Sequence, residues 1–529
     1  MTTKFPEVAS YGSFLSGPTI PRLLAAAALQ RGTDPYARMG AEELTLGDLA
    51  DVVSDTQQRL LALGVRRGDR VAVMLPNHLD HVGIIFALIG LRAIWVPVNP
   101  KLRGEPLHHQ LRTSDPKLII IDWRYRDQVD SLENGDLSAR TIHWGGDRSS
   151  APTRRSPGLP ADVTAVDPVG ADDVISVMYT SGTTGAAKGV QLTDRMLRAA
   201  ALGAAITSEP DEGDVFLLWE PLCHIGGAQV LLLPFVRRVR LAMVERFSAS
   251  RFWDEAVSLG ATHIHHLGGI LPMLLGRPAH DAERSHRVKV SWGGGMTADS
   301  WREAEERFGI RVRECYGMTE ASSISTCNST GAGHGIGRPL PHFDVEVHDD
   351  SGQQAPEGAT GEIVLRPRTT GLVTPGYLND PVATAAAWRN GWWHTGDAGR
   401  VRDGSLHYVG RCSDSMRHRG ENVSAWEIES VVNTHPAVAE SALVGVPALG
   451  GEQDLLLFIS LADGATVIPS DLLTWCKGRL APYQVPRYVT VVDQFPKTAS
   501  QRIAKGALPH NADAWHDAGP EGGRRLLTR

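Results

Sequence analysis

The segment 179–189 reads Tyr179-Thr-Ser-Gly-Thr-Thr-Gly-Ala-Ala-Lys188-Gly189 and directly follows an apolar run at 174–178. Its glycines allow backbone angles that other residues avoid and let main-chain N–H groups approach an anion, while the hydroxyls and Lys188 add donors and a positive charge. The segment therefore predicts a phosphate-binding loop. Its candidate ligands are Thr180, Ser181, Gly182, Thr183, Thr184 and Lys188.

Two other kinds of loop share parts of this pattern. A Walker A loop is excluded, because Ala187 precedes Lys188 and Gly189 follows it, whereas that motif requires Gly-Lys-Ser/Thr. An ordinary strand-to-helix connection is the competing interpretation, since Thr193 is placed to cap a following helix.

The whole chain has 529 residues, more than the roughly 250–300 at which a single core stops growing, so two or more domains are expected. Its 53 basic and 60 acidic residues give a net charge of −7, which offers no broad basic field for nucleic acid or an anionic membrane. The five cysteines form no CxxC pair, and the first residues lack the pattern of a leader, so a reduced, cytoplasmic protein is expected. The longest apolar stretch, near 82–91, is shorter than the ~20 residues of a membrane span and predicts a buried helix.

The apolar spacing predicts an α/β fold. A helix is expected between Thr45 and Gly64, strands at 71–75 and 94–98, and a further helix from Leu79 between them. This β-α-β alternation predicts parallel strands covered by helices. After Arg411 the pattern changes to short helices and strands that predict a small α+β unit. Its helices are expected at 426–432 and 472–480, and its strands at 442–446, 455–459 and 488–492.

Further motifs follow the loop in a fixed order, and they can be listed by residue: Pro-Leu-Cys-His-Ile-Gly-Gly at 221–227, Trp-Gly-Gly-Gly-Met at 292–296, Tyr-Gly-Met-Thr-Glu at 316–320, Trp-His-Thr-Gly-Asp at 393–397, Tyr-Val-Gly-Arg at 408–411 and Pro-Lys-Thr at 496–498. Together they resemble the acyl-adenylate-forming superfamily of acyl-CoA synthetases, peptide-synthetase adenylation domains and beetle luciferases. The segment 419–424 is most similar to that of carnitine and crotonobetaine-CoA-ligase-like members. The resemblance implies an N-terminal adenylation domain, 1–411, and a mobile C-terminal lid, 412–529, with a hinge near 412–414.

The resemblance also implies roles for single residues. Thr319 and Glu320 would face the α-phosphate of ATP, with Glu320 also binding Mg²⁺, for which a carboxylate is a suitable hard ligand. His224 would lie beside the substrate carboxylate. The remaining nucleotide and coenzyme contacts are Asp397 and Arg411 for the ribose, Gly293, Gly294, Gly295 and Tyr316 for the adenine, and Gly420 and Glu421 for the pantetheine of coenzyme A.

Two positions depart from the family pattern. Relatives read Gly-Lys where this chain reads Gln501-Arg502, so Arg502 stands where a catalytic lysine is expected. Arginine keeps the charge, but its planar guanidinium is not interchangeable with an ammonium group, and Lys505 is the alternative cation. At the hinge, Ser413 occupies a position usually held by Asp or Lys, which still allows a pivot.

The acyl group is expected near His224 and the segment 261–269, Ala-Thr-His-Ile-His-His-Leu-Gly-Gly. Its three histidines could recognise a polar or anionic group, or could alternate between core and solvent; zinc is not favoured. A thiol dyad of Cys223 and His224 is rejected, because neighbours on an extended chain point to opposite sides.

The predicted function is an AMP-forming acid:CoA ligase that uses ATP, Mg²⁺ and coenzyme A. The expected partner is a small carboxylic acid of unspecified identity, with neither nucleic acid nor membrane, and a homodimer is an option. The alternative keeps adenylation but changes the acceptor to a carrier-protein thiol, an amine, or nitrite in the diazotisation of an aromatic amine. A non-catalytic nucleotide-binding relative is disfavoured by Lys188, Glu320, Asp397 and Arg411.

Overall fold

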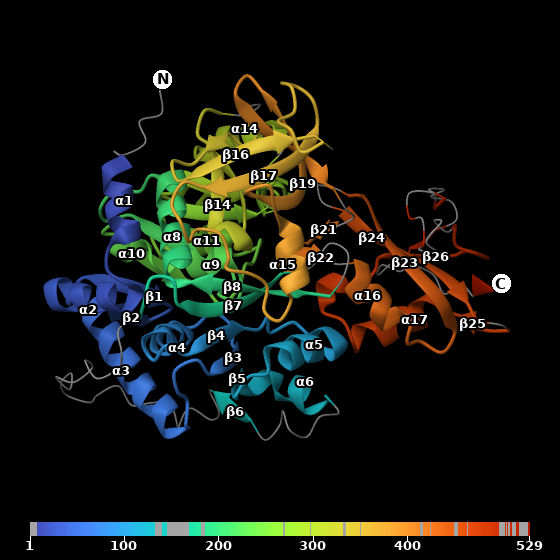
Figure 1. Cartoon of the computed structure of the whole chain (residues 1–529), viewed down its shortest axis with the longest axis horizontal. Helices are drawn as coiled ribbons and strands as arrows, with labels where there is room; N and C mark the ends of the chain where they lie inside the picture. The colour runs from blue at the N-terminus through green and yellow to red at the C-terminus, as the bar shows by residue number, and fades with distance from the viewer. Residues whose placement is uncertain are drawn as a thin grey trace.

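The computed structural model describes residues 8–132, 140–144, 169–180, 186–267, 270–296, 298–331, 335–349, 351–412, 416–419, 421–423, 425–448, 453–462, 464–496, 503, 505, 508–509, 515–517 and 527–528. A large N-terminal domain carries a smaller C-terminal domain on one side (Figure 1). This division confirms the predicted α/β architecture with a small α+β unit after it.

A six-stranded sheet carries the phosphate-loop segment at one edge. Its order is β6 (Thr141–Trp144), β5 (Leu118–Asp122), β3 (Arg70–Met74), β4 (Ile94–Pro97), β7 (Val174–Thr180) and β8 (Lys188–Thr193). The strands from β6 to β7 are parallel, and β8 alone runs antiparallel to its neighbour. The expected strands at 71–75 and 94–98 correspond to β3 and β4.

A second, nine-stranded sheet forms the middle of the N-terminal domain. Its order is β15 (Arg338–Pro339), β14 (Ser323–Asn328), β13 (Arg311–Met318), β12 (Val290–Gly294), β11 (His263–Leu267), β9 (Val215–Leu218), β10 (Arg240–Met243), β1 (Pro35–Met39) and β2 (Glu42–Thr45). The strands from β13 to β1 are parallel, and antiparallel strands close both edges. In open α/β sheets ligands bind beyond the carboxyl ends of such parallel strands.

A third sheet links the nine-stranded sheet to the C-terminal domain. It contains β16 (Phe343–His348), β17 (Gly361–Pro367), β19 (Trp392–Arg402) and β18 (Trp388–Arg389), and β20 (Ser405–Arg411) pairs with β19. The chain leaves β20 for the C-terminal domain, so the predicted hinge directly follows this sheet.

The C-terminal domain has a hairpin, a sheet and two helices. The hairpin joins β21 (Met416–His418) and β22 (Glu421–Val423); the sheet has the order β23 (Val438–Pro447), β24 (Gln453–Leu461), β26 (Tyr488–Val491) and β27 (His516–Asp517). A short pair joins β25 (Thr466–Val467) and β28 (Leu527–Thr528). The helices are α16 (Ala425–Val432) and α17 (Pro469–Lys477). These two helices and the strands β23, β24 and β26 match the expected elements, whereas the hairpin and the short strands β25, β27 and β28 were not predicted.

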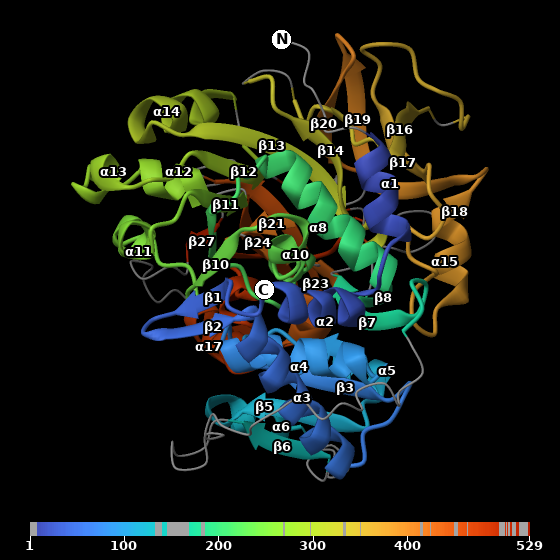
Figure 2. The same cartoon turned by 90° about the vertical axis from the view of Figure 1, so that its left-hand side faces the viewer.

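Helices cover the sheets of the N-terminal domain. They are α1 (Val8–Ser16), α2 (Ile20–Arg31), α3 (Leu46–Ala62), α4 (Leu79–Gly90), α5 (Gly104–Ser114), α6 (Arg126–Asp130), α8 (Asp194–Ser208), α9 (Ile225–Val230), α10 (Leu233–Val236), α11 (Phe252–Ser258), α12 (Ile270–Leu275), α13 (Ala282–Ser285), α14 (Ala298–Phe308) and α15 (Pro381–Ala387). Figure 2 shows α3 and α4 together beside β3, and α8 crossing the region of β13 and β14.

The start of α3 shows how local sequence sets a helix boundary. The Thr45 hydroxyl accepts a hydrogen bond from the Asp48 amide at 3.1 Å, while the Asp48 carboxylate accepts one from the Thr45 amide at 2.9 Å. This reciprocal capping box satisfies two helix-end donors, and Gly64 beyond the other end has a left-handed φ of 83°. Both boundaries confirm the sequence prediction.

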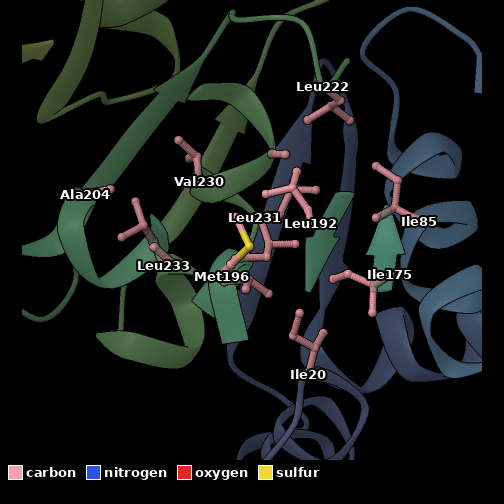
Figure 3. Packing of buried hydrophobic residues seen from close by; sticks show 14 of the residues in the cluster. Ile20, Ile85, Ile175, Leu192, Met196, Ala204, Leu222, Val230, Leu231 and Leu233 are labelled. Atoms are coloured by element: carbon pink, nitrogen blue, oxygen red, sulfur yellow. The ribbon is translucent and has the colours of Figure 1, made fainter. Parts of the chain in front are cut away.

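One continuous apolar core joins the two large sheets. Figure 3 shows Ile85 of α4 and Ile175 of β7 facing the same core as Met196 of α8 and Leu231. Because both layers bury their apolar faces here, the phosphate-loop edge and the carboxyl ends of the nine-stranded sheet are held in a fixed relation.

None of the described helices combines the length and apolar character that crossing a bilayer requires. The apolar stretch near 82–91 is instead α4, whose side chains are almost entirely buried in the core, as predicted.

Candidate active site

The phosphate-loop segment connects two antiparallel strands. Thr180 at the end of β7 is paired with Lys188 at the start of β8, so the two residues close the loop. Ser181, Gly182, Thr183 and Thr184 lie outside the described residues. The competing strand-to-helix interpretation is only partly right: Thr193 caps α8 by accepting the Met196 amide at 3.2 Å, but β8 separates that helix from the loop.

Lys188 and Glu320 meet at a tyrosine. The Lys188 ammonium lies 4.9 Å from the centroid of the Tyr377 ring, within cation–π distance. The Tyr377 hydroxyl donates to Glu320 Oε1 at 3.0 Å. Glu320 is buried in a single 3₁₀ turn, Thr319–Ala321, and the Tyr377 side chain contacts both it and Lys188, the predicted Mg²⁺ and phosphate residues.

This tyrosine was missed by sequence reasoning. Tyr377 is bridged to Val190 of β8, and the Gly376 carbonyl next to it accepts the Gln191 amide at 3.2 Å. The contact joins segments far apart in the chain, and nothing in the local Thr-Pro-Gly-Tyr pattern indicates it.

The predicted nucleoside residues gather around Asp397. The Tyr316 hydroxyl donates to Asp397 Oδ2 at 2.7 Å, and the Tyr408 hydroxyl lies 3.5 Å from Oδ1. Arg411 is the register partner of Asp397 across β19 and β20, which places both predicted ribose residues at one point of the sheet. The structure thus brings together residues from three motifs, and it adds Tyr408.

The glycine turn at the end of β12 is tightly enclosed. A Cβ on Gly293 would overlap the carbonyl oxygen of His266 on β11, and one on Gly294 would lie 2.9 Å from the Cys315 carbonyl oxygen. The Gly295 amide donates to Glu314 Oε1 at 2.5 Å, and the Met296 amide donates to the same oxygen at 3.1 Å. Only glycine fits the first position, because the neighbouring strand leaves no room for a Cβ.

His224 meets the C-terminal domain. Its Nε2 lies 3.2 Å from Glu421 Oε2 on β22, so the hairpin predicted to contact pantetheine lies against the residue predicted to contact the substrate carboxylate. Burial alone would lower the pKa of His224, but the Cys223 sulfur and the Glu421 carboxylate outweigh it and raise this pKa well above its usual range.

The expectation that the Cys223 and His224 side chains point to opposite sides is wrong. It assumed an extended chain, in which neighbouring side chains point apart. The segment is a turn, with the His224 amide donating to the Pro221 carbonyl at 3.0 Å, and the Cys223 and His224 side chains interact. The period of two applies to strands and fails in a turn.

One of the two candidate cations of the C-terminal domain is paired away from this site. Lys505 forms an ion pair with Glu429 of α16, at 2.7 Å, inside the C-terminal domain. Arg502 and Gly420 lie outside the described residues.

The three histidines of β11 are all buried and each lies beside an acid. His263 is 3.8 Å from Asp214, His265 is 2.7 Å from Glu220, and His266 is 3.5 Å from Glu314. The interpretation that these histidines alternate between core and solvent is therefore wrong, because both faces of β11 are covered.

Comparison with known proteins places the chain in a family. Residues 24–378 match the model of the AMP-binding enzyme family, and residues 427–502 match that of the AMP-binding enzyme C-terminal domain. The chain therefore belongs to the AMP-binding enzymes.

Individual relatives narrow the class. The chain is 31% identical over 484 residues to the probable CoA ligase CCL9 of Humulus lupulus, covering 88% of this chain and 91% of that protein. It is 28% identical to a crotonobetaine/carnitine–CoA ligase of Salmonella paratyphi B, over 88% of this chain and 93% of the relative. A structure of o-succinylbenzoate CoA synthetase from Bacillus subtilis superposes with a TM-score of 0.80 at 26% identity, over 92% of this chain and 98% of that one. These similarities confirm the prediction of an AMP-forming acid–thiol ligase.

Proposed function

We propose that the protein activates a small carboxylic acid with ATP and transfers the acyl group to coenzyme A. In the first step a carboxylate oxygen attacks the α-phosphorus, the bond to the β-phosphate breaks, and pyrophosphate leaves. In the second step the thiol sulfur attacks the acyl carbon, the acyl–phosphate bond breaks, AMP leaves, and the thiol proton is released. The crotonobetaine/carnitine and o-succinylbenzoate ligases named above support this reading.

The observation that carries the proposal is the convergence of residues from separate motifs. Lys188 and Glu320 meet at Tyr377, and Asp397 accepts a hydrogen bond from Tyr316. A cation for the triphosphate and an acceptor for ribose hydroxyls are the groups that positioning of a nucleotide requires.

The donor chemistry around Glu320 also fits Mg²⁺. This ion typically uses one or two carboxylates together with substrate phosphates and water, and the Glu320 carboxylate stands next to the Thr319 hydroxyl in one turn. Bound Mg²⁺ would neutralise part of the triphosphate charge. The role of this chain is to hold the carboxylate in place, and the Tyr377 hydroxyl does so.

The orientation of the C-terminal domain supports the second step. Glu421 lies at His224, whereas Lys505 is paired within its own domain. We infer that residues 412–529 form a lid that turns about 412–414 and that this orientation serves acyl transfer, while another orientation brings Arg502 or Lys505 to the site for adenylation. The C-terminal domain has an apolar core of its own around Ile428 and Leu457, as a separately moving unit requires. The cytoplasmic location and the option of a homodimer stay predictions.

One assay tests the function. The protein is incubated with ATP, Mg²⁺ and a panel of acids, and pyrophosphate release is measured; coenzyme A, an amine or nitrite is then added separately and the product is identified by mass. AMP with an acyl-CoA is expected. A product that requires the amine or nitrite would reassign the acceptor, and the absence of pyrophosphate with every acid would contradict the proposal.

A further inference from the structure

A buried pair of ionisable side chains lies beyond the proposed reacting groups. Glu220 follows β9 and His265 belongs to the adjacent β11, and their side chains are 5% and 8% exposed. Glu220 Oε2 and His265 Nδ1 approach to 2.7 Å, yet neither atom makes a hydrogen bond of acceptable geometry within the described part of the chain. A buried carboxylate and imidazole left in this state are costly unless another group completes their hydrogen bonds.

A second pair lies on the opposite face of the sheet, because His265 and His266 are consecutive residues of β11. His266 Nε2 and Glu314 Oε2 are 3.5 Å apart, and again neither atom has a hydrogen-bond partner among the described residues. The other atoms of these side chains are occupied: His266 Nδ1 lies 2.9 Å from the Ser291 hydroxyl, and Glu314 Oε1 accepts two amides of the glycine turn. Unsatisfied polar atoms therefore lie on both faces of the sheet near the carboxyl end of β11.

In the part of the chain that the structure describes, no lysine or arginine lies within ion-pair distance of Glu220 or Glu314. Burial lowers the pKa of His266 and raises that of the nearby Cys315 thiol, so both groups are neutral at physiological pH. Glu220 Oε2 thus lacks a lysine or arginine partner among the described residues, which favours a hydrogen-bond donor as its missing partner.

The position of Glu220 relates the pair of Glu220 and His265 to the proposed reaction. Its carboxylate lies directly against Gly226, two residues after His224, and a side chain at Gly226 would overlap it. On the other side, His266 is the register partner of Gly293 in the predicted adenine turn. An acid whose carboxylate lies at His224 and whose adenylate lies at the glycine turn therefore has its acyl body next to Glu220 and His265.

We propose that the carboxylate of Glu220, held beside His265, determines substrate specificity by accepting a hydrogen bond from an amino or hydroxyl group on the acyl part of the acid. This inference rests on the proposed function and specifies its substrate class as amino- or hydroxy-substituted carboxylic acids. A site built to accept a donor discriminates strongly against the analogue that lacks it, because its buried acceptors are then left unpaired.

The test uses matched acids that differ in one donor group. Benzoate is compared with meta- and para-aminobenzoate and with the two hydroxybenzoates, and hexanoate with its omega-amino derivative, by kcat/KM for pyrophosphate release. In the unmodified protein, the kcat/KM of an acid that carries the donor group is expected to exceed that of its unsubstituted analogue at least ~10-fold in the benzoate or the hexanoate series. Glu220→Gln and His265→Phe are each expected to reduce this ratio by about 10- to 100-fold.

Asp214→Asn is the matched control. Asp214 precedes β9 as Glu220 follows it, is equally buried, and lies beside another histidine of β11, His263. Its replacement is expected to leave the ratio of the two kcat/KM values unchanged. Because both values scale with the fraction of folded enzyme, a loss of stability does not change their ratio. The inference would be overturned if the ratio in the unmodified protein were close to 1, or if Glu220→Gln and His265→Phe both left the ratio unchanged. Failure of every acid to release pyrophosphate would instead contradict the proposed function.

Discussion

Glu320 carries the negative charge that we propose for the first half-reaction. It is buried and accepts a hydrogen bond from Tyr377, so Glu320→Gln keeps the shape and a hydrogen-bond acceptor but removes the negative charge proposed for Mg²⁺. We expect pyrophosphate release to fall at least ~100-fold, the size of effect seen when a charge-stabilising group is lost from an active site. A Mg²⁺ titration of the rate measures it.

The control for this prediction is Glu346→Gln. Glu346 lies on β16 beside His348, at 2.9 Å, and has no contact with the proposed nucleotide site. Activity of Glu320→Gln equal to that of the control would remove Glu320 from the metal role. Lys188→Ala should depress the same step, because it removes the cation that lies over the Tyr377 ring and that we propose for the triphosphate.

His224 gives a prediction in pH. Because its pKa is raised in the folded protein, its contact with Glu421 contributes stability fully below the unfolded pKa of about 6.5, and this contribution is lost as the pH rises through the raised value. Glu421→Gln should lower the pKa of His224, although the Cys223 sulfur remains. Titration of the histidine ring signals by NMR, with His224→Gln to assign the resonance, measures this change; an unaltered pKa would mean that Glu421 does not contact His224 in solution.

At the scale of elements, the glycine turn after β12 sets a tight limit on substitution. Gly293→Ala would place a methyl group onto the His266 carbonyl of the neighbouring strand, where a backbone shift is needed to relieve the overlap. We expect a loss of about 3 kcal/mol or more in the free energy of unfolding, measured by denaturant titration.

Gly12→Ala provides the comparison. Gly12 lies in α1 with nothing within 4 Å of an added Cβ, so alanine should be neutral or slightly stabilising there. Equal denaturation midpoints for the two variants would show that β11 and β12 are less closely packed than the structure has them.

The sequence predicted elements where local signals decide them. The helix α3 was expected because Thr45 and Gly64 mark its ends, and β3 because a continuous apolar run suits a strand buried on both faces. The strand β8 was missed, since its antiparallel pairing with β7 depends on the fold around it. In the site, motif residues were predicted one by one, but Tyr377 and the contact of His224 with Glu421 depend on tertiary placement that no local pattern encodes.

At the scale of the whole molecule, the two domains touch at a few points besides the site. Lys101 lies 5.9 Å from the ring centroid of Tyr483, and a Cβ on Gly104 at the start of α5 would lie 2.8 Å from the carbonyl oxygen of Arg479. These contacts belong to the orientation in which Glu421 meets His224. A lid that turns about 412–414 would break them, so they can be altered without touching the nucleotide residues.

Gly104→Leu should therefore separate the two half-reactions. The new side chain would wedge against Arg479 only in this orientation, so we expect pyrophosphate release to stay within about threefold of normal while acyl transfer to coenzyme A slows at least ~10-fold, which corresponds to about 1.4 kcal/mol. Gly40→Leu is the control, because Gly40 has a similar φ, 59° against 54°, but no neighbour within 4 Å, and it carries the same backbone strain without the wedge. Single-turnover measurements of each step, with pre-formed acyl-adenylate for the second, distinguish the outcomes. Equal slowing of both steps in Gly104→Leu would mean that a single orientation of the C-terminal domain serves the whole reaction.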